Sequence, residues 1–215
     1  MTVTVLDYGR SNLLSVRRAL EHCGAQVCFA RTPQQAAAAQ RLVLPGVGAF
    51  KDGMQALASR GLVAPLLEQA RRGTPVLAIC LGMQMLFSES DEGGRCAGLG
   101  LVPGRVQRLP ALDASGAPQR VPHIGWYALT PCAVPLAGTV LADVPAGGQM
   151  YFVHSYEAKP AQPLARLADT EYGGRRVCAA VQCGCVTGVQ FHPEKSGEAG
   201  LSILRRFLAQ PAAQT

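Results

Sequence analysis

Long apolar runs are absent from this chain. In its 215 residues, no apolar stretch reaches the ~20 residues that a transmembrane helix needs. The N-terminus runs directly into a strand-like segment, residues 2–6, and shows neither the basic segment nor the cleavage site of a secretory signal. We therefore expect a cytoplasmic protein with no membrane contact.

Charged residues are also few, at 16%, whereas apolar residues make up 48% of the chain. Disordered chains show the opposite balance, so this composition predicts a packed core. A chain of this length commonly forms one α/β domain. We expect residues 1–215 to form a single domain.

The net charge is +6, and many of the arginines come in pairs that are spread along the chain. A nucleic-acid-binding face would concentrate this charge, so we expect no nucleic-acid partner. Two interpretations of the charge remain open. It forms either a solvated basic surface or a face that meets an acidic partner.

The chain has eight cysteines but no secretory signal, so we expect reduced thiols, most of them buried as small apolar groups. Cys178, Cys183 and Cys185 lie close together in the sequence. Their spacing lacks the paired cysteines of a zinc knuckle. We therefore predict neither a metal nor any other cofactor.

The first ninety residues alternate between short apolar strands and helical patterns. The strand-like segments are residues 3–7, 26–30, 42–44 and 76–79, and the helical ones are residues 13–22, a short segment from Pro33, 50–72 and 81–87. Short apolar strands separated by helices indicate a parallel sheet with right-handed crossovers.

A different pattern follows between residues 98 and 190. Strand-like runs with Pro and Gly breaks occur at residues 101–109, 125–129, 149–153, 177–181 and 186–191. Residues 110–120 predict a loop, and residues 198–208 a last helix. The predicted fold class is α/β, a mostly parallel sheet flanked by helices, with an added antiparallel section.

Cys80 stands where a predicted buried strand runs into a predicted helix, in the segment 78–84 (AICLGMQ). This arrangement is typical of a nucleophile elbow, which presents one side chain above the sheet. The free N–H groups and positive dipole end of the helix favour a thiolate there. The alternative interpretation is an ordinary buried core cysteine.

His192 directly follows a predicted strand, in the segment 188–196 (GVQFHPEKS). The C-terminal ends of strands are where α/β proteins place their sites. Glu194, two residues on, is placed to hold one imidazole nitrogen while the other accepts a thiol proton. Alone, His192 could be structural and Glu194 a surface charge, but together with Cys80 they form a more specific pattern.

A third segment, residues 45–50 (PGVGAF), also joins a strand to a helix. Its two glycines free the backbone to aim N–H groups inward, as one oxyanion donor, with the Leu81 N–H as the other. The alternative is an ordinary turn. A dinucleotide fingerprint is not present.

Together these motifs resemble the class I glutamine amidotransferases, which use a Cys-His-Glu triad to release ammonia through a glutamyl thioester. The segments 7–9 (DYG), 123–126 (HIGW) and 151–156 (YFVHSY) further resemble the glutaminase subunits of imidazole glycerol phosphate synthases, over nearly the whole chain. The resemblance implies a flavodoxin-like sheet. It also implies L-glutamine as substrate and, as partner in a heterodimer, a (β/α)8-barrel cyclase subunit that receives the ammonia.

The resemblance also assigns residues. It implies a triad of Cys80, His192 and Glu194 and an oxyanion hole of the Val47 and Leu81 amides. The implied glutamine-binding residues are Gly48, Gln84, Ser155 and Tyr156. The implied partner interface comprises Asn12, Trp126, Tyr151 and Lys195, although core packing is an equal alternative for Trp126 and Tyr151.

The chain departs from the family pattern at Ser11, which replaces a glycine, and at Ile124 and Tyr127. These departures bear on the partner contact rather than on the triad. Three rival functions remain: a glutaminase of another pathway, a non-catalytic subunit that keeps the fold, and a hydrolase that acts without a partner.

Overall fold

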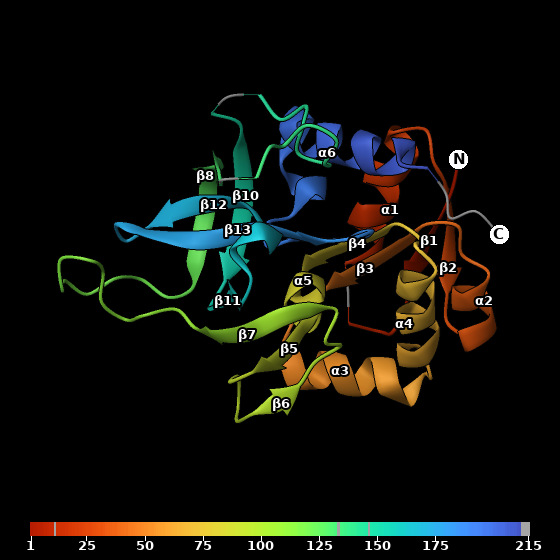
Figure 1. The fold of residues 1–215 in the computed structure, drawn as a ribbon, viewed down its shortest axis with the longest axis horizontal. Coiled ribbons are helices and arrows are strands. Elements are labelled where there is room, and N and C mark those ends of the chain that lie inside the picture. The colour runs from red at the N-terminus through yellow and green to blue at the C-terminus, as the bar shows by residue number, and fades with distance from the viewer. Residues whose placement is uncertain (11, 133, 146, 212–215) are drawn as a thin grey trace.

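The computed structural model describes residues 1–10, 12–132, 134–145 and 147–211 (Figure 1). Its helices and strands are, in chain order, β1 (Thr2–Leu6), α1 (Leu13–His22), β2 (Gln26–Ala30), α2 (Pro33–Ala37), β3 (Leu42–Gly46), α3 (Phe50–Ser59), α4 (Val63–Arg71), β4 (Val76–Cys80), α5 (Leu81–Met85), β5 (Phe87–Ser90), β6 (Cys96–Ala97), β7 (Val102–Arg108), β8 (His123–Ala128), β9 (Thr130–Pro131), β10 (Gln149–His154), β11 (Tyr156–Pro160), η1 (Pro163–Ala165), β12 (Arg166–Tyr172), β13 (Arg175–Cys183), β14 (Val186–Val189), η2 (Pro193–Lys195) and α6 (Gly197–Ala209).

An eight-stranded sheet forms the centre of the molecule, in the order β2-β1-β3-β4-β14-β13-β12-β9. The strands from β2 to β14 run parallel, and β13, β12 and β9 continue the sheet in antiparallel fashion. Every residue of the central strand β4 is buried, as expected for a parallel strand that is covered on both faces. The predicted fold class is therefore confirmed.

Helices cover both faces of the parallel part of the sheet. Alternate residues of β3 point to opposite faces, so Leu42 and Leu44 join one apolar cluster and Val43 joins the other. The first cluster contains the buried apolar side chains of α2, α3, α4 and α5, and the second contains those of α1 and α6. Figure 1 shows α1 and α6 above the sheet and α3, α4 and α5 below it.

The antiparallel section adds two smaller sheets to the central one. Strands β10 and β8 form an antiparallel pair, and a four-stranded sheet follows the order β11-β7-β5-β6. The loop between β7 and β8 projects from this end in Figure 1 (green). It contains the segment 110–120 that the sequence predicts as a loop, and one isolated bridge joins Leu112 to Pro118.

The helical patterns predicted over residues 50–72 form two helices, α3 and α4, because the chain turns at Gly61, which has a φ of 65°. One helical prediction needs correction. The helix predicted over residues 81–87 ends at Met85, because the Met85 and Leu86 carbonyls accept hydrogen bonds from Leu99 and Val102 and Phe87 already belongs to β5. None of the helices in the described part of the chain is long and apolar enough to cross a membrane.

Candidate active site

Cys80 lies at a strained strand-to-helix junction, as the elbow prediction requires. It ends β4 and precedes α5, with φ 54° and ψ −111°, and it is the only non-glycine residue among those described with a positive φ. Such a conformation costs about 1–3 kcal/mol and persists only where packing holds it. Gly82 provides that packing, because a Cβ there would lie 1.9 Å from the Leu44 carbonyl oxygen.

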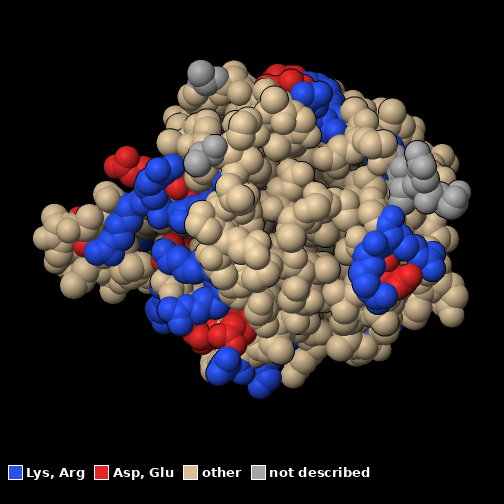
Figure 2. Space-filling model, viewed as in Figure 1, with Lys and Arg blue, Asp and Glu red and all other residues tan. Residues whose placement is uncertain are grey.

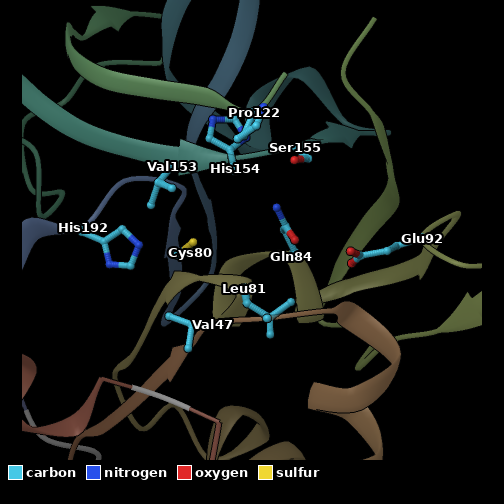
Figure 3. Close-up of a pocket in the computed structure, with 11 residues that line it drawn as sticks. Val47, Cys80, Leu81, Gln84, Glu92, Pro122, Val153, His154, Ser155 and His192 are labelled. Carbon is cyan, nitrogen blue, oxygen red and sulfur yellow. The ribbon is translucent and has the colours of Figure 1, made fainter. Parts of the chain in front are cut away.

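His192 and Glu194 form a buried pair beside this junction. The His192 Nδ1 atom lies 2.7 Å from Glu194 Oε1, and the two side chains are only 4% and 1% exposed. The other ring nitrogen, Nε2, has no nitrogen or oxygen partner among the described residues, and it faces the Cys80 sulfur (Figure 3). Burial lowers the pKa of an imidazole, but hydrogen bonds to Cys80 and Glu194 outweigh it and raise the pKa of His192 to about 10.

A cavity of about 360 Å³ opens above the sulfur (Figure 3). Its lining residues are Val47, Gly48, Cys80, Leu81, Gln84, Glu92, Pro122, Val153, His154, Ser155 and His192. Of the predicted substrate residues, Gly48, Gln84 and Ser155 therefore line it. Tyr156 lies one layer behind, and its carbonyl oxygen accepts a hydrogen bond of 3.1 Å from Gln84 Nε2.

The two predicted oxyanion donors differ in the hydrogen bonds that their N–H groups make. Leu81 is the first residue of α5, where a backbone N–H has no acceptor within its own helix. The Val47 N–H, in contrast, donates to the Arg10 carbonyl oxygen at 2.9 Å. The predicted donation from Val47 into the cavity is therefore not made in this arrangement, because a backbone N–H has a single proton to donate.

Glu92 is a cavity residue that the sequence analysis missed. Its Oε2 accepts a hydrogen bond of 2.7 Å from the Phe50 N–H, at the N-terminus of α3. Figure 3 shows its carboxylate at the end of the cavity away from His192, beyond Gln84. Nothing in the local sequence around Glu92 marks it, because the helix end that it contacts lies about forty residues earlier in the chain.

Three of the predicted interface residues lie together near the triad. Trp126 is 59% exposed, and its ring lies 4.8 Å from that of Tyr151. The Lys195 ammonium lies 5.5 Å from the Tyr151 ring centre, and the Tyr151 ring lies 6.4 Å from that of His192. Asn12 is exposed at the start of α1.

The departures from the family pattern differ in position. Tyr127 packs inward, with its ring 4.3 Å from that of His123 and 6.3 Å from that of Phe152. It therefore belongs to the buried aromatic packing behind β8 and not to the exposed face of Trp126. Ile124 is 48% exposed on that outer face. Ser11 lies outside the described residues.

The basic residues are interspersed with acidic ones. Figure 2 shows Lys and Arg over the antiparallel section and around α4, with Asp and Glu among them. Arg166 and Arg176 both pair with Asp169, and Arg71 and Arg72 both pair with Glu68. This mixture favours the solvated-surface interpretation on the face in view.

The eight cysteines are free thiols, but only Cys80 and Cys178 are buried, so the expectation that most of them are buried is wrong. Cys178 is buried, and burial raises its pKa to about 12, so it is an inert core thiol. Cys183 and Cys185 pack against the same apolar cluster. Within the described residues, no group of three His, Cys, Asp or Glu side chains has the geometry to hold a metal ion.

Comparison with known proteins identifies the family. The model of the class I glutamine amidotransferases matches residues 4–211. "Imidazole glycerol phosphate synthase subunit HisH 1" of Legionella pneumophila (strain Lens) is 47% identical over 96% of this chain and 98% of its own length. The corresponding subunit HisH of Moorella thermoacetica is 46% identical over 95% of this chain and 93% of its own length.

Solved structures show the same fold at low identity. A glutamine amidotransferase superimposes with a TM-score of 0.72 at 18% identity, over 96% of this chain and 99% of its own. A chain of PurLQS from Thermotoga maritima superimposes with a TM-score of 0.72 at 20% identity, over 96% and 97%. The chain therefore belongs to the class I glutamine amidotransferases, and within them to the HisH subunits of imidazole glycerol phosphate synthase.

Proposed function

We propose that this chain is the glutaminase subunit of an imidazole glycerol phosphate synthase, with residues 1–215 acting as one amidotransferase domain. It hydrolyses L-glutamine to glutamate and ammonia. The ammonia passes to a cyclase subunit that makes imidazole glycerol phosphate and AICAR in histidine biosynthesis. The observation that carries this proposal is the arrangement of Cys80 at a strained elbow, facing His192 Nε2, with Glu194 on Nδ1.

The first chemical step transfers the thiol proton from Cys80 to His192 Nε2. Glu194 stabilises the resulting imidazolium through its 2.7 Å contact with Nδ1. The raised pKa of His192 is consistent with a proton that rests on the imidazole. The sulfur then attacks the side-chain amide carbon of glutamine, forming a carbon–sulfur bond and a negatively charged oxygen.

The Leu81 N–H is one donor to this oxyanion. The second donor is the Val47 N–H, which first has to leave the Arg10 carbonyl and turn into the cavity. The Val47 N–H is part of the peptide that joins Gly46 to Val47, and Gly46 permits its rotation because it carries no side chain. Each such donor contributes ~10²–10³ in rate, so the resting arrangement supports only low activity.

Collapse of the tetrahedral intermediate releases the ammonia. His192 gives its proton to the leaving nitrogen as the carbon–nitrogen bond breaks, which leaves a thioester on Cys80. His192 then takes a proton from a water molecule, whose oxygen attacks the thioester carbon. Glutamate leaves as the carbon–sulfur bond breaks, and the sulfur and imidazole return to their starting state.

The cavity carries a negative charge that is complementary to the α-ammonium group of glutamine. The Glu92 carboxylate lies at the end of the cavity away from His192, where it can pair with the substrate α-ammonium group (Figure 3). Gly48 and Ser155 line the walls between the two ends. This polarity orients the side-chain amide towards Cys80 and His192.

We assign the cyclase contact to the exposed surface beside the triad that carries Trp126, Tyr151 and Lys195, with Asn12 at its edge. Trp126, Ile124 and Val47 leave large apolar side chains exposed there, at 59%, 48% and 42%. Val47 belongs both to this surface and to the cavity. A (β/α)8 barrel docked here would therefore contact the residue whose N–H is the second oxyanion donor. Ammonia released beneath such a partner has a short path into it.

The decisive experiment is a glutaminase assay of Cys80→Ala in the reconstituted complex with the cyclase and its phosphorylated ligand. Activity should be lost while partner binding is retained. Cys28→Ala, which removes an exposed thiol, is the matched control and should keep full activity. Hydrolysis by Cys80→Ala above the uncatalysed rate would contradict the assignment.

The same preparation separates the rival functions. A glutamyl adduct on Cys80, detected by mass spectrometry, excludes a non-catalytic subunit. Activity that rises in proportion to added cyclase and saturates at one equivalent excludes a hydrolase that works alone. Failure of this cyclase to bind at all would point to the glutaminase of another pathway.

A further inference from the structure

A chain of buried hydrogen bonds leads from the antiparallel section to the Cys80 sulfur. From the sulfur outward, Gln190 Nε2 lies 3.8 Å from Cys80 Sγ, and Gln84 Nε2 lies 3.0 Å from Gln190 Oε1 and 3.1 Å from the Tyr156 carbonyl oxygen. His154 Nδ1 lies 2.8 Å from the same carbonyl oxygen, and His123 Nδ1 lies 2.9 Å from His154 Nε2. The residues that contribute side chains to this series are all buried, at 7% exposed or less.

The Tyr156 carbonyl oxygen determines which atom donates and which accepts in each of these hydrogen bonds. A main-chain carbonyl oxygen only accepts, so the Gln84 atom that faces the Tyr156 oxygen has to be its amide nitrogen. The same nitrogen faces Gln190, which must therefore present its amide oxygen. The Gln190 amide nitrogen then has no orientation left except towards Cys80 Sγ. The sulfur consequently receives a donor, not an acceptor.

The histidine branch is fixed by the same carbonyl. His154 Nδ1 must carry a proton to donate to the Tyr156 oxygen, so Nε2 is the acceptor for the His123 Nδ1–H. Both rings are neutral in this arrangement. Burial lowers the pKa of His123 to about 3 and that of His154 to about 4, which keeps both rings neutral throughout the neutral range.

Gln190 stands out as a polar residue in an apolar setting. Its two chain neighbours, Val189 and Phe191, are fully buried, and so is its own side chain, at 0% exposed. A buried amide is costly unless its hydrogen bonds are made. Among the described residues its side chain has two partners, Gln84 and Cys80. An aliphatic side chain would pack there without that cost, so the amide is present for these two partners, of which the sulfur is the one that its nitrogen faces.

We propose that Gln190 is a catalytic residue: its side-chain N–H donates to the Cys80 sulfur, stabilises the thiolate and holds it in line for attack, while Gln84 and the Tyr156 carbonyl keep the amide in this orientation. This inference rests on the proposed function of Cys80 as nucleophile. His192 contacts the sulfur from the cavity and Gln190 from the buried side. The sulfur is therefore held between two donors, of which only His192 exchanges a proton.

The test measures the pH dependence of Cys80 alkylation by chloroacetamide in the free subunit, with the modified peptide identified by mass spectrometry. A hydrogen bond to a charged sulfur changes the thiolate population about tenfold. Gln190→Met keeps the length of the side chain and removes the donor. It should move the midpoint of the alkylation profile up by about one pH unit. Gln190→Glu, which places a carboxylate beside the sulfur, should move it further.

The matched control is Gln182→Met on β13, where the amide donates only to the Gly184 carbonyl oxygen of its own turn, at 3.2 Å. Its profile should coincide with that of the wild type. His192 and Tyr8 are titratable groups that interact with Cys80, and both remain in every variant. A shift confined to the Gln190 variants therefore reports the amide.

A second variant keeps the proposal testable if Gln190→Met does not fold. Gln84→Met leaves the Gln190 amide in place but removes the group that orients it, and it should move the midpoint in the same direction by a smaller amount. A wild-type midpoint in the folded Gln190→Met or Gln84→Met protein would overturn the proposal. A wild-type Cys80 no more reactive than the exposed Cys28 near neutral pH would instead contradict the proposed function itself.

Discussion

At Gly82, the addition of one methyl group should lower the rate of glutamine hydrolysis strongly while the protein still folds. A Cβ atom at this residue would lie 1.9 Å from the Leu44 carbonyl oxygen of β3. Buried main-chain atoms cannot yield as a flexible side chain does. Helix α5 therefore has to move by about 1 Å before the contact becomes tolerable, at about 3 Å.

This displacement acts directly on the reacting groups. Gly82 lies two residues beyond Cys80, so a shift of α5 moves both the sulfur and the Leu81 amide relative to His192. A misplacement of about 1 Å is enough to cost ~10²-fold in rate. Gly82→Ala should therefore lower kcat for glutamine hydrolysis about 100-fold in the cyclase complex, and it should cost roughly 1–3 kcal/mol in the free energy of unfolding.

The assay compares steady-state glutaminase rates at saturating cyclase with urea unfolding of the free subunit. Gly104→Ala is the matched control, because its Cβ would lie 2.3 Å from the Lys159 carbonyl oxygen, at the opposite end of the β7–β11 pair from Tyr156. Because Gly104 also has a φ of 137°, it should lose at least as much stability as Gly82→Ala, yet keep kcat within about threefold of the wild type. Folded Gly82→Ala with more than about a third of the wild-type kcat would refute the reasoning.

Two further predictions concern the triad and the interface. Burial lowers the pKa of His192, but hydrogen bonds to Cys80 and Glu194 outweigh this effect and raise the pKa to about 10. The charge of His192 therefore stabilises the folded protein fully below pH ~6.5 and progressively less as the pH rises towards 10. The difference in free energy of unfolding between wild type and Glu194→Gln should therefore shrink from about pH 7 to about pH 10 in urea titrations, and a constant difference would argue against this ion pair. Trp126→Ala, at 59% exposed, should leave the Tm unchanged but weaken cyclase binding about 30-fold by calorimetry. The control Leu164→Ala, at 78% exposed in η1, should bind as the wild type does, and equal affinities of the two variants would remove Trp126 from the interface.

The parts of the site that the sequence predicts are those encoded by neighbouring residues. The elbow follows from an apolar strand, a cysteine and a small residue two positions on, and all three lie within the segment 76–82. The His192–Glu194 pair follows from two residues one proline apart. Local patterns also place the parallel strands, because a strand buried on both faces is a short continuous apolar run.

The antiparallel section was harder to predict for a physical reason. Strand β11 contains Glu157, Lys159 and Pro160, and β12 contains Asp169 and Glu171, so neither shows a clean alternation of apolar and polar residues. Some of these charges pair within their own strand, as Lys159 does with Glu157, and others pair with residues of a neighbouring strand. Asp169 pairs with Arg176 of β13, for example, and such pairs are invisible in a single segment. The tertiary contacts, not the local sequence, make these segments strands.

Gln190, Glu92 and the His123–His154 pair cannot be picked out from the sequence for the same reason. Gln190 is separated from Gln84 by 106 positions and from Cys80 by 110, and Glu92 is 42 positions from the helix end that it contacts. A single polar residue within an apolar run is the only local signal that Gln190 gives. Its direction of donation becomes clear only when the Tyr156 carbonyl is seen at the other end of the chain of bonds.

The two halves of the proposed active site differ in how firmly they are held. Cys80 is constrained by a positive φ, by the contact of Gly82 with Leu44 and by donors on two sides, so its sulfur has little freedom to move. The Val47 peptide is held away from the cavity by one hydrogen bond to Arg10, next to a glycine and on the exposed rim. One such bond contributes only about 0.5–1.5 kcal/mol, far less than would be needed to displace the elbow. If the proposed cyclase docks on this rim, we therefore expect it to raise the activity by turning the Val47 peptide, while the nucleophile stays where the fold has placed it.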